Sequence, residues 1–137
     1  MRREGSCPCG AVRYAIAGRV RDVLVCHCEA CREATGGPWP ASAAARTDLV
    51  IADPTALAWT RPAVSAGGAS RGRCRVCGTV VFWDAPANET VSFAVATLAD
   101  AFGLEVAAHI WTRDCEETES PNYEEGLPAS VVVPWRD

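Results

Sequence analysis

Eight cysteines are the residues of this chain whose type and spacing could do chemistry, and they lie at positions 7, 9, 26, 28, 31, 74, 77 and 115. Two segments, Cys7-Pro8-Cys9-Gly10 and Cys74-Arg75-Val76-Cys77-Gly78, carry a glycine directly after the second cysteine. A metal knuckle curls the backbone so that amide N–H groups point back at the thiolates, and glycine accepts the positive φ that this requires. We therefore expect the two pairs to meet around one structural zinc, for which four thiolates form a closed ligand set. The alternative is that these cysteines are free and buried, or that they form only one loose knuckle. The expected ligands are Cys7, Cys9, Cys74 and Cys77.

Cys26, Cys28 and Cys31 form a second group, with spacers of one and two residues. Such short spacers allow one loop to place three sulfurs on one ion and to leave the fourth tetrahedral position open, which distinguishes a reactive zinc from a structural one. Three thiolates on a divalent ion leave a net negative charge, which weakens the ion as an acid for activating water. An incoming thiol would instead bind there as a thiolate. This group therefore predicts a second, substrate-side zinc that takes part in thiol chemistry.

We do not expect His27, His109 or Cys115 to be metal ligands. His27 lies between two of the expected ligands, and we expect it to support the site or the fold rather than to bind the metal. His109 lies in a strand-like segment, where we expect it to pack in the core or to line a pocket. Cys115 has no nearby cysteine partner and lies in the acidic stretch 114–119, so we leave it out of the sites.

Three arginines flank the cysteine groups. Arg32 follows the three-cysteine group, while Arg71 and Arg73 precede the second knuckle. They could face an anionic substrate near the metals, but for each of them we expect a solvated position on the surface. The chain contains no G-x-S-x-G, G-x-G-x-x-G or P-loop pattern, so the cysteines alone carry the predicted chemistry.

A mainly β chain must position these groups. In six segments, apolar residues alternate with polar ones or run together with β-branched and aromatic residues, and turn-forming residues separate the segments, which predicts strands. The helical signals are weak: one or two turns over Glu29–Thr35, ending at Gly36-Gly37, and a second short piece over Leu98–Phe102. The predicted strands are Ala11–Ile16, Leu49–Ala52, Leu57–Thr60, Thr79–Trp83, Val91–Ala96 and Ala107–Thr112.

Length and composition favour a single domain over residues 1–137, since 49% hydrophobic and 22% charged residues are typical of a globular chain of this size. The net charge of −4 argues against sequence-independent binding of nucleic acid. The N-terminal sequence M-R-R-E-G-S-C lacks the apolar core of a signal peptide, and no run of residues is long enough to span a bilayer. We therefore expect a cytoplasmic protein with no membrane partner, in which thiols stay reduced and serve as metal ligands rather than in disulfides.

The order of the cysteine clusters resembles the glutathione-dependent formaldehyde-activating enzyme family, which also includes centromere protein V. The resemblance runs from about residue 5 to residue 128, leaving 129–137 as a tail, and rests on G-S-C-P-C-G-A-V-R-Y, V-C-H-C-E-A-C-R, R-G-R-C-R-V-C-G-T, V-A-T-L and H-I-W. It implies a β-tent fold of packed antiparallel sheets and two zinc ions per chain. By position, the four knuckle cysteines match the family's structural zinc, while Cys26, Cys28 and Cys31 match its second, glutathione-associated zinc. The family's activity is the condensation of glutathione with formaldehyde to S-(hydroxymethyl)glutathione, classed as a carbon-sulfur lyase.

Three functions remain open on the sequence. In the first, the chain is a zinc-dependent enzyme of the carbon-sulfur lyase type that condenses glutathione, or a similar thiol, with formaldehyde or another small aldehyde to an S-hydroxymethyl adduct. In the second, the same site holds glutathione or another thiol as a non-catalytic carrier or sensor, because no general acid or base beyond His27 is evident beside the cluster. In the third, both zinc sites are closed and structural, and His27 or His109 fills the fourth position.

Overall fold

The computed structural model describes residues 2–27, 29–61, 68–110 and 133–137, and these are mainly short strands. The helical elements are α1 (Glu29–Thr35) and the 3-10 turns η1 (Arg46–Asp48), η2 (Pro54–Ala56) and η4 (Val95–Thr97). The predicted mainly β fold of packed antiparallel sheets with few short helices is thus confirmed, while the zinc that would pin the sheets stays a prediction. The strands are β1 (Arg2–Ser6), β2 (Arg13–Ala17), β3 (Val20–Arg21), β4 (Val23–Cys26), β5 (Trp39–Ala45), β6 (Leu49–Ile51), β7 (Leu57–Thr60), β8 (Ser70–Cys74), β9 (Val80–Asp84), β10 (Thr90–Ala94), β11 (Val106–Ile110) and β12 (Trp135–Arg136).

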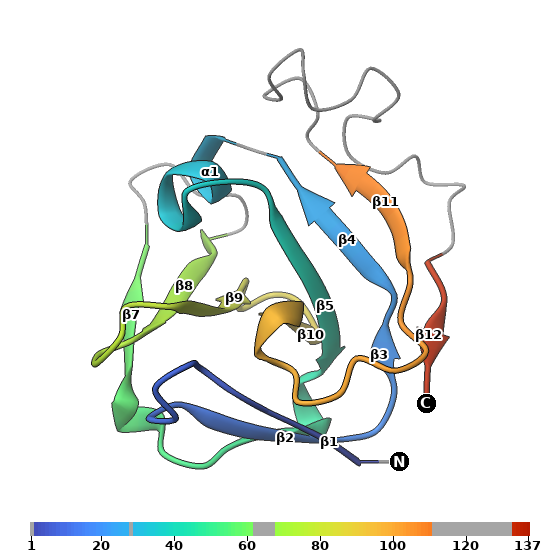
Figure 1. The fold of residues 1–137 in the computed structure, drawn as a ribbon, viewed down its shortest axis with the longest axis horizontal. Coiled ribbons are helices and arrows are strands. Elements are labelled where there is room, and N and C mark those ends of the chain that lie inside the picture. The colour runs from blue at the N-terminus through green and yellow to red at the C-terminus, as the bar shows by residue number, and fades with distance from the viewer. Residues whose placement is uncertain (1, 28, 62–67, 111–132) are drawn as a thin grey trace.

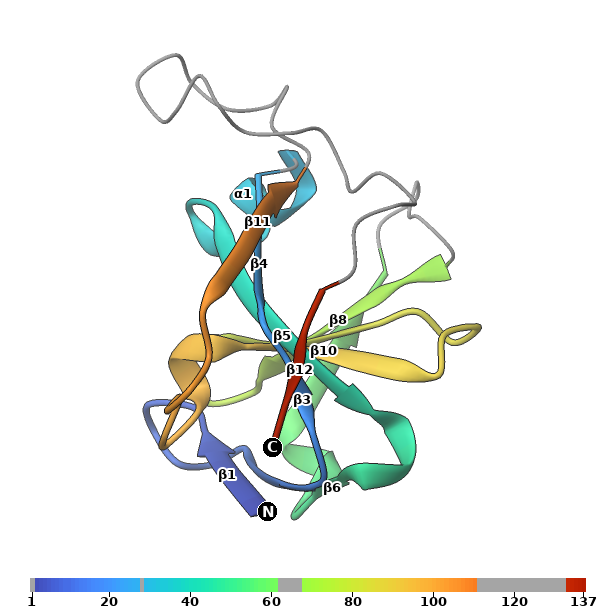
Figure 2. The ribbon, with the colours of Figure 1, turned by 90° about the vertical axis from the view of Figure 1, so that its right-hand side faces the viewer.

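The strands form two sheets, which Figures 1 and 2 show from two sides. The small sheet has the order β1-β2-β6, and the large sheet has the order β11-β4-β5-β10-β9-β8-β7, with β3 pairing with both β5 and β12. Neighbouring strands are antiparallel except β11 and β4, whose parallel pairing brings a late segment of the chain beside an early one. In both views the small sheet lies at one end of the molecule and α1 lies at the other.

The main hydrophobic core contains side chains of both sheets. The ring of Tyr14 in β2 lies 5.2 Å from that of Phe82 in β9 and 5.6 Å from that of Phe93 in β10. Its hydroxyl lies 2.7 Å from the hydroxyl of Thr97, so the polar end of this buried side chain has a hydrogen-bond partner. Gly5 pairs with Tyr14 across β1 and β2, and a Cβ at Gly5 would overlap the tyrosine ring. The close approach of the two strands therefore requires glycine at this position.

The six predicted strands all form, and their ends differ from the predicted ones by no more than two residues where the structure describes both. Ala11–Ile16 begins two residues late, as β2, because the residues before it complete the first cysteine knuckle. Ala107–Thr112 forms β11 up to Ile110, and its last two residues lie outside the described residues. The predicted helix Glu29–Thr35 is α1 and ends before Gly36, whose φ of +83° suits a helix C-terminus. The other four confirmed strands are β6, β7, β9 and β10.

The predicted helical piece at Leu98–Phe102 is wrong. Leu98 forms an antiparallel bridge with Gly5 of β1, and the N–H of Ala99 donates to the carbonyl of Glu4 at 2.9 Å. Backbone groups that a helix would pair internally are therefore paired with a strand from the other end of the sequence. Tertiary pairing has overridden a weak local preference.

A partly buried ion pair ties the C-terminal strand β12 to the large sheet. Asp22 is 2% exposed and accepts hydrogen bonds from Nε and Nη2 of Arg136 at 3.0 and 2.8 Å. The N–H of Glu105 donates to the same carboxylate at 3.2 Å. These bonds, Arg136 foremost, hold the pKa of Asp22 below its usual range.

Among the described residues, none belongs to a helix that is long and apolar enough to cross a membrane.

Candidate metal centre

The structure brings the sulfurs of Cys7, Cys9, Cys74 and Cys77 together, within 4.8 Å of one another. The first two residues lie in the turn between β1 and β2, Cys74 ends β8, and Cys77 lies in the turn before β9. The sulfur of Cys9 lies 3.4 Å from that of Cys7 and 3.5 Å from that of Cys74. The pairs therefore meet as their spacing predicts, and the cluster joins the small sheet to the large one. Binding of zinc by this cluster stays a prediction.

Both turns have the backbone geometry of metal knuckles. Gly10 and Gly78 have φ values of +80° and +78°, as the glycine after each pair predicts. The N–H of Val12 lies 3.4 Å from the sulfur of Cys7. The N–H groups of Val76 and Cys77 each lie 3.4 Å from the sulfur of Cys74. These amides point at sulfur and would stabilise it as a thiolate.

The donor set and its electrostatics fit a divalent ion. Four sulfurs at about 2.3 Å from a zinc ion stand about 3.8 Å apart in a tetrahedron, close to the separations observed here. Hydrogen bonding to the side chain and backbone of Thr79 lowers the pKa of Cys77 to about 6. The backbone of Ala11 lowers the pKa of Cys9, but the neighbouring sulfurs, that of Cys7 foremost, outweigh it and raise this pKa to about 12. Crowded thiolates repel one another, so a bound cation is needed for all four to ionise near neutral pH.

The second predicted group is described only in part. Cys26 ends β4, Cys31 lies in α1, and their sulfurs are 3.3 Å apart. Cys28, the third predicted ligand, lies outside the described residues, as does Cys115. The structure thus brings together two of the three sulfurs, and the three-sulfur zinc site stays a prediction.

Aromatic and apolar side chains surround these two sulfurs. Cys31 packs in a small buried cluster with Trp39 at the start of β5, and Trp83 of β9 packs against the same cluster. Trp39 is also the pairing partner of Cys26 across β4 and β5. The remaining residues of the cluster are Ala41, Val80 and Ala94, with Cys26 and Ala34 packed against it. An apolar surrounding of this kind keeps water away and strengthens electrostatic interactions.

The expectation of a surface position is wrong for Arg71. This side chain of β8 is only 7% exposed, and its Nη2 donates to the sulfur of Cys31 at 3.4 Å. Arg73, two residues further along, donates to the carbonyl of Ala34 at the end of α1 at 3.1 Å and to that of Gly78 at 3.4 Å. A single strand thus contacts the three-cysteine group through Arg71, contacts α1 through Arg73 and supplies the sulfur of Cys74 to the four-cysteine group.

The two histidines form a pair that sequence reasoning missed. Nε2 of His27 lies 2.9 Å from Nδ1 of His109, and the backbone N–H of His27 donates to the carbonyl of Ile110 at 3.0 Å. His27 is 2% exposed, which agrees with a supporting role, and burial, followed by the charge of His27, lowers the pKa of His109. The parallel pairing of β4 and β11 creates this contact. No local pattern in the sequence indicates that pairing.

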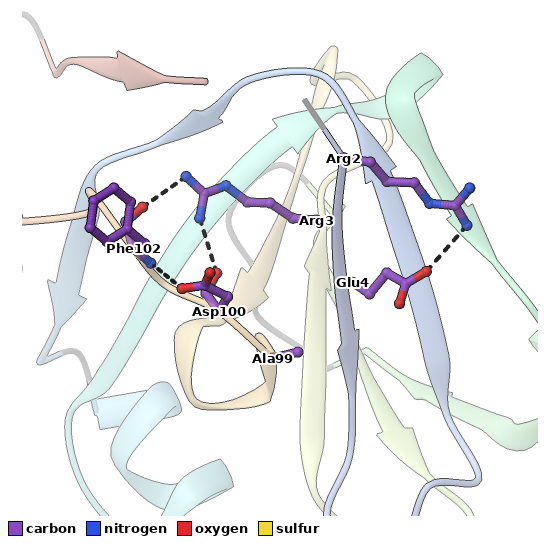
Figure 3. A pocket seen from close by; sticks show the side chains of 6 residues that line it. All are labelled: Arg2, Arg3, Glu4, Ala99, Asp100 and Phe102. Carbon is purple, nitrogen blue, oxygen red and sulfur yellow. Dashed lines mark hydrogen bonds and ion pairs between the residues drawn. The ribbon is translucent and has the colours of Figure 1, made fainter.

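A hollow of about 430 Å³ has no cysteine among its lining residues, and Figure 3 shows the side chains that line it. Arg3 is buried beside it and donates to the main-chain oxygens of Asp100 and Phe102 at 3.0 and 2.9 Å. Its guanidinium is therefore used to hold the chain itself, and we assign this hollow no part in the site. It is lined by Arg2, Arg3, Glu4, Ala99, Asp100 and Phe102.

Comparisons with known proteins give a family and similar solved structures. A family model described as "Glutathione-dependent formaldehyde-activating enzyme" matches residues 2–114, a span that begins and ends earlier than the expected 5–128. The chain is also similar to the crystal structure of a Rhodobacter sphaeroides protein, a structural genomics target. The two share 26% sequence identity and superpose with a TM-score of 0.58, covering 74% of this chain and 90% of that one. No curated protein matches the chain.

Proposed function

The chain belongs to the glutathione-dependent formaldehyde-activating enzyme family, and from this premise we propose that it is a zinc-dependent enzyme of the carbon-sulfur lyase type. Its reaction would condense glutathione, or a similar thiol, with formaldehyde or another small aldehyde to an S-hydroxymethyl adduct. In this reaction the thiol sulfur forms a bond to the carbonyl carbon, the π electron pair moves to the oxygen, and the oxygen gains the proton that the thiol loses. No oxidant or reductant is needed.

We propose two zinc ions per chain. Cys7, Cys9, Cys74 and Cys77 would hold a structural zinc, and this assignment is supported by their mutual distances and by the amide N–H groups that point at sulfur. Cys26, Cys28 and Cys31 would hold the second zinc, supported by the 3.3 Å separation of the first and last of these sulfurs. When bound there, zinc would supply an open coordination position at which a substrate thiol is held as a thiolate.

The protein's own residues prepare this position. Trp39 and Trp83 keep the surrounding of Cys31 apolar, so that a thiolate held there by the metal would be poorly hydrated and more nucleophilic toward an aldehyde. Arg71 provides a buried positive charge beside the sulfurs. The 3.3 Å approach of two ligand sulfurs beside that charge is the observation that carries the proposal.

A second candidate function is a non-catalytic carrier or sensor of thiols that uses the same site. The pairing of His27 with His109 favours it, because one nitrogen of each ring is occupied by the other ring and is not available to move a proton for a substrate. Binding of glutathione without acceleration of the aldehyde reaction would establish this second function.

We further propose that residues 1–137 form one zinc-binding domain of the reducing cytoplasm. Both ends of the chain are tied to the same body: Arg3 donates to the main-chain oxygen of Asp137 at 2.8 Å, and β12 pairs with β3. The described cysteines make no disulfide with one another, which suits a compartment where thiols remain available to metal.

The test is exchange of labelled formaldehyde with glutathione, followed by NMR in the presence of the zinc-loaded protein. Because thiols and formaldehyde combine unaided, the uncatalysed rate is measured alongside and subtracted. We expect acceleration by the wild-type protein and by Cys115→Ala, a thiol that we place outside the sites, and its loss in Cys31→Ala. Absence of acceleration in wild-type protein with two bound zinc ions would count against the enzyme.

A further inference from the structure

Arg71 is the buried charged group closest to the three-cysteine group within the described part of the chain. It lies in β8, opposite Trp83 of β9 in the sheet register, and is 7% exposed. Its bond to the sulfur of Cys31 is the one hydrogen bond that the Arg71 side chain makes with the described residues. A guanidinium has five N–H donors, and no nitrogen of Arg71 is among the fully buried side-chain nitrogens without a partner in the described part of the chain. The remaining N–H groups of Arg71 are therefore available to a second anion beside this sulfur.

If the proposed function holds, the second site carries a negative charge that the guanidinium of Arg71 can offset. A divalent ion with three thiolates carries one net negative charge, and a fourth thiolate makes it two. Such a site in an apolar surrounding repels an incoming anion and would prefer a neutral ligand such as imidazole or water. The buried guanidinium offsets this repulsion, and Trp39 and Trp83 keep its charge from being screened by water.

We propose that Arg71 determines the ligand specificity of the second site: it holds Cys31 through one N–H group and binds the incoming thiolate through others, so that the site takes an anionic sulfur in preference to a neutral ligand. The inference rests on the proposed function and adds a residue to it. Arg73, in contrast, donates its side-chain hydrogen bonds only to main-chain oxygens among the described residues, and one of these bonds anchors α1.

The experiment uses the full chain loaded with Co²⁺, whose sulfur-to-metal charge-transfer bands report on its ligands. Each protein is titrated with 2-mercaptoethanol, which has no charge except at sulfur, and separately with imidazole. The closed four-sulfur set offers no position for an added ligand, so spectral changes report on the second site. Arg75→Gln is the matched control, because it removes the same charge from an exposed position whose side chain donates to the carbonyl of Thr55.

We expect Arg71→Gln to weaken thiol binding at least tenfold, or about 1.4 kcal/mol, with imidazole affinity changed less than about threefold. Arg71→Lys should recover most of the thiol affinity because it keeps the charge, and Arg75→Gln should match the wild type. Equal losses for both ligands, or unchanged thiol affinity in Arg71→Gln, would overturn the inference and leave the proposed function intact. A wild-type protein that binds Co²⁺ through three sulfurs and takes up no thiol would instead refute the proposed function.

If Arg71→Gln does not fold, Arg71→Lys alone tests the inference about Arg71. A thiol-to-imidazole preference within about threefold of the wild type supports specificity through charge, since lysine cannot reproduce the planar guanidinium. If Arg71→Lys loses the preference for thiol over imidazole, specificity through charge is contradicted.

Discussion

Replacing Gly78 with alanine should weaken the four-cysteine knuckle through the backbone alone. Gly78 follows Cys77 with a φ of +78°, and a Cβ added there would meet no atom within 4 Å. The substitution therefore causes no steric clash, and its cost is the left-handed conformation of an L-residue, about 1–2 kcal/mol. Reduced entropy of the unfolded chain returns about 0.4–1 kcal/mol. We expect the free energy of unfolding of the zinc-loaded protein to fall by about 1 kcal/mol.

Gly37 provides the matched control for this substitution. A Cβ there also meets no atom within 4 Å, but Gly37 is not among the positive-φ glycines. Gly37→Ala should therefore leave the free energy of unfolding unchanged or raise it slightly. Urea unfolding of both zinc-loaded variants measures the difference, and competition with a chromophoric chelator tests whether the loss at Gly78 also lowers zinc affinity. Equal effects at the two positions would refute the argument that the knuckle's backbone geometry matters.

Three further predictions concern the metal and the core. Removing zinc with a strong chelator under reducing conditions should unfold the protein, because ligation by four thiolates contributes on the order of 10–16 kcal/mol in small zinc peptides; a metal-free chain with unchanged circular dichroism would contradict this. Asp22→Asn should cost about 2–3 kcal/mol at neutral pH in urea unfolding, less than a fully buried pair because the Arg136 side chain is 40% exposed. Since Arg136 lowers the pKa of Asp22, this contribution is complete at neutral pH and disappears only as the pH falls through the folded-state pKa, so a variant as stable as the wild type at pH 7 would exclude it. Tyr14→Phe should cost about 1 kcal/mol because it leaves the Thr97 hydroxyl with one partner fewer, and thermal unfolding measures it.

The six predicted strands contain branched or aromatic residues, but β4 (Val23–Cys26), which contains them too, was not predicted, and neither were strands made mainly of small or polar residues. Leu57–Thr60 carries apolar and aromatic residues between turn signals and is found with the predicted bounds. The longest strand, Trp39–Ala45, has the sequence W-P-A-S-A-A-A, in which small residues hide a largely buried strand. β8, with the sequence S-R-G-R-C, has no apolar pattern at all, although its position between β7 and β9 makes it central to both cysteine groups.

The candidate site likewise has features that the sequence indicates and features that it does not. The meeting of the four knuckle cysteines follows from local spacing, because each pair and its glycine form a unit that needs a partner. The burial of Arg71 against Cys31 and the pairing of His27 with His109 depend on which strands become neighbours. β4 and β11 are separated by most of the chain, so their parallel register could not be read from either segment.

The zinc content per chain tests the central claim most directly, that seven sulfurs divide into a closed set of four and an open set of three. Elemental analysis of the reduced wild-type protein should give two zinc ions per chain, and Cys28→Ala should give one while remaining folded. A wild-type protein with one zinc, or a Cys28→Ala variant that retains two, would contradict the account.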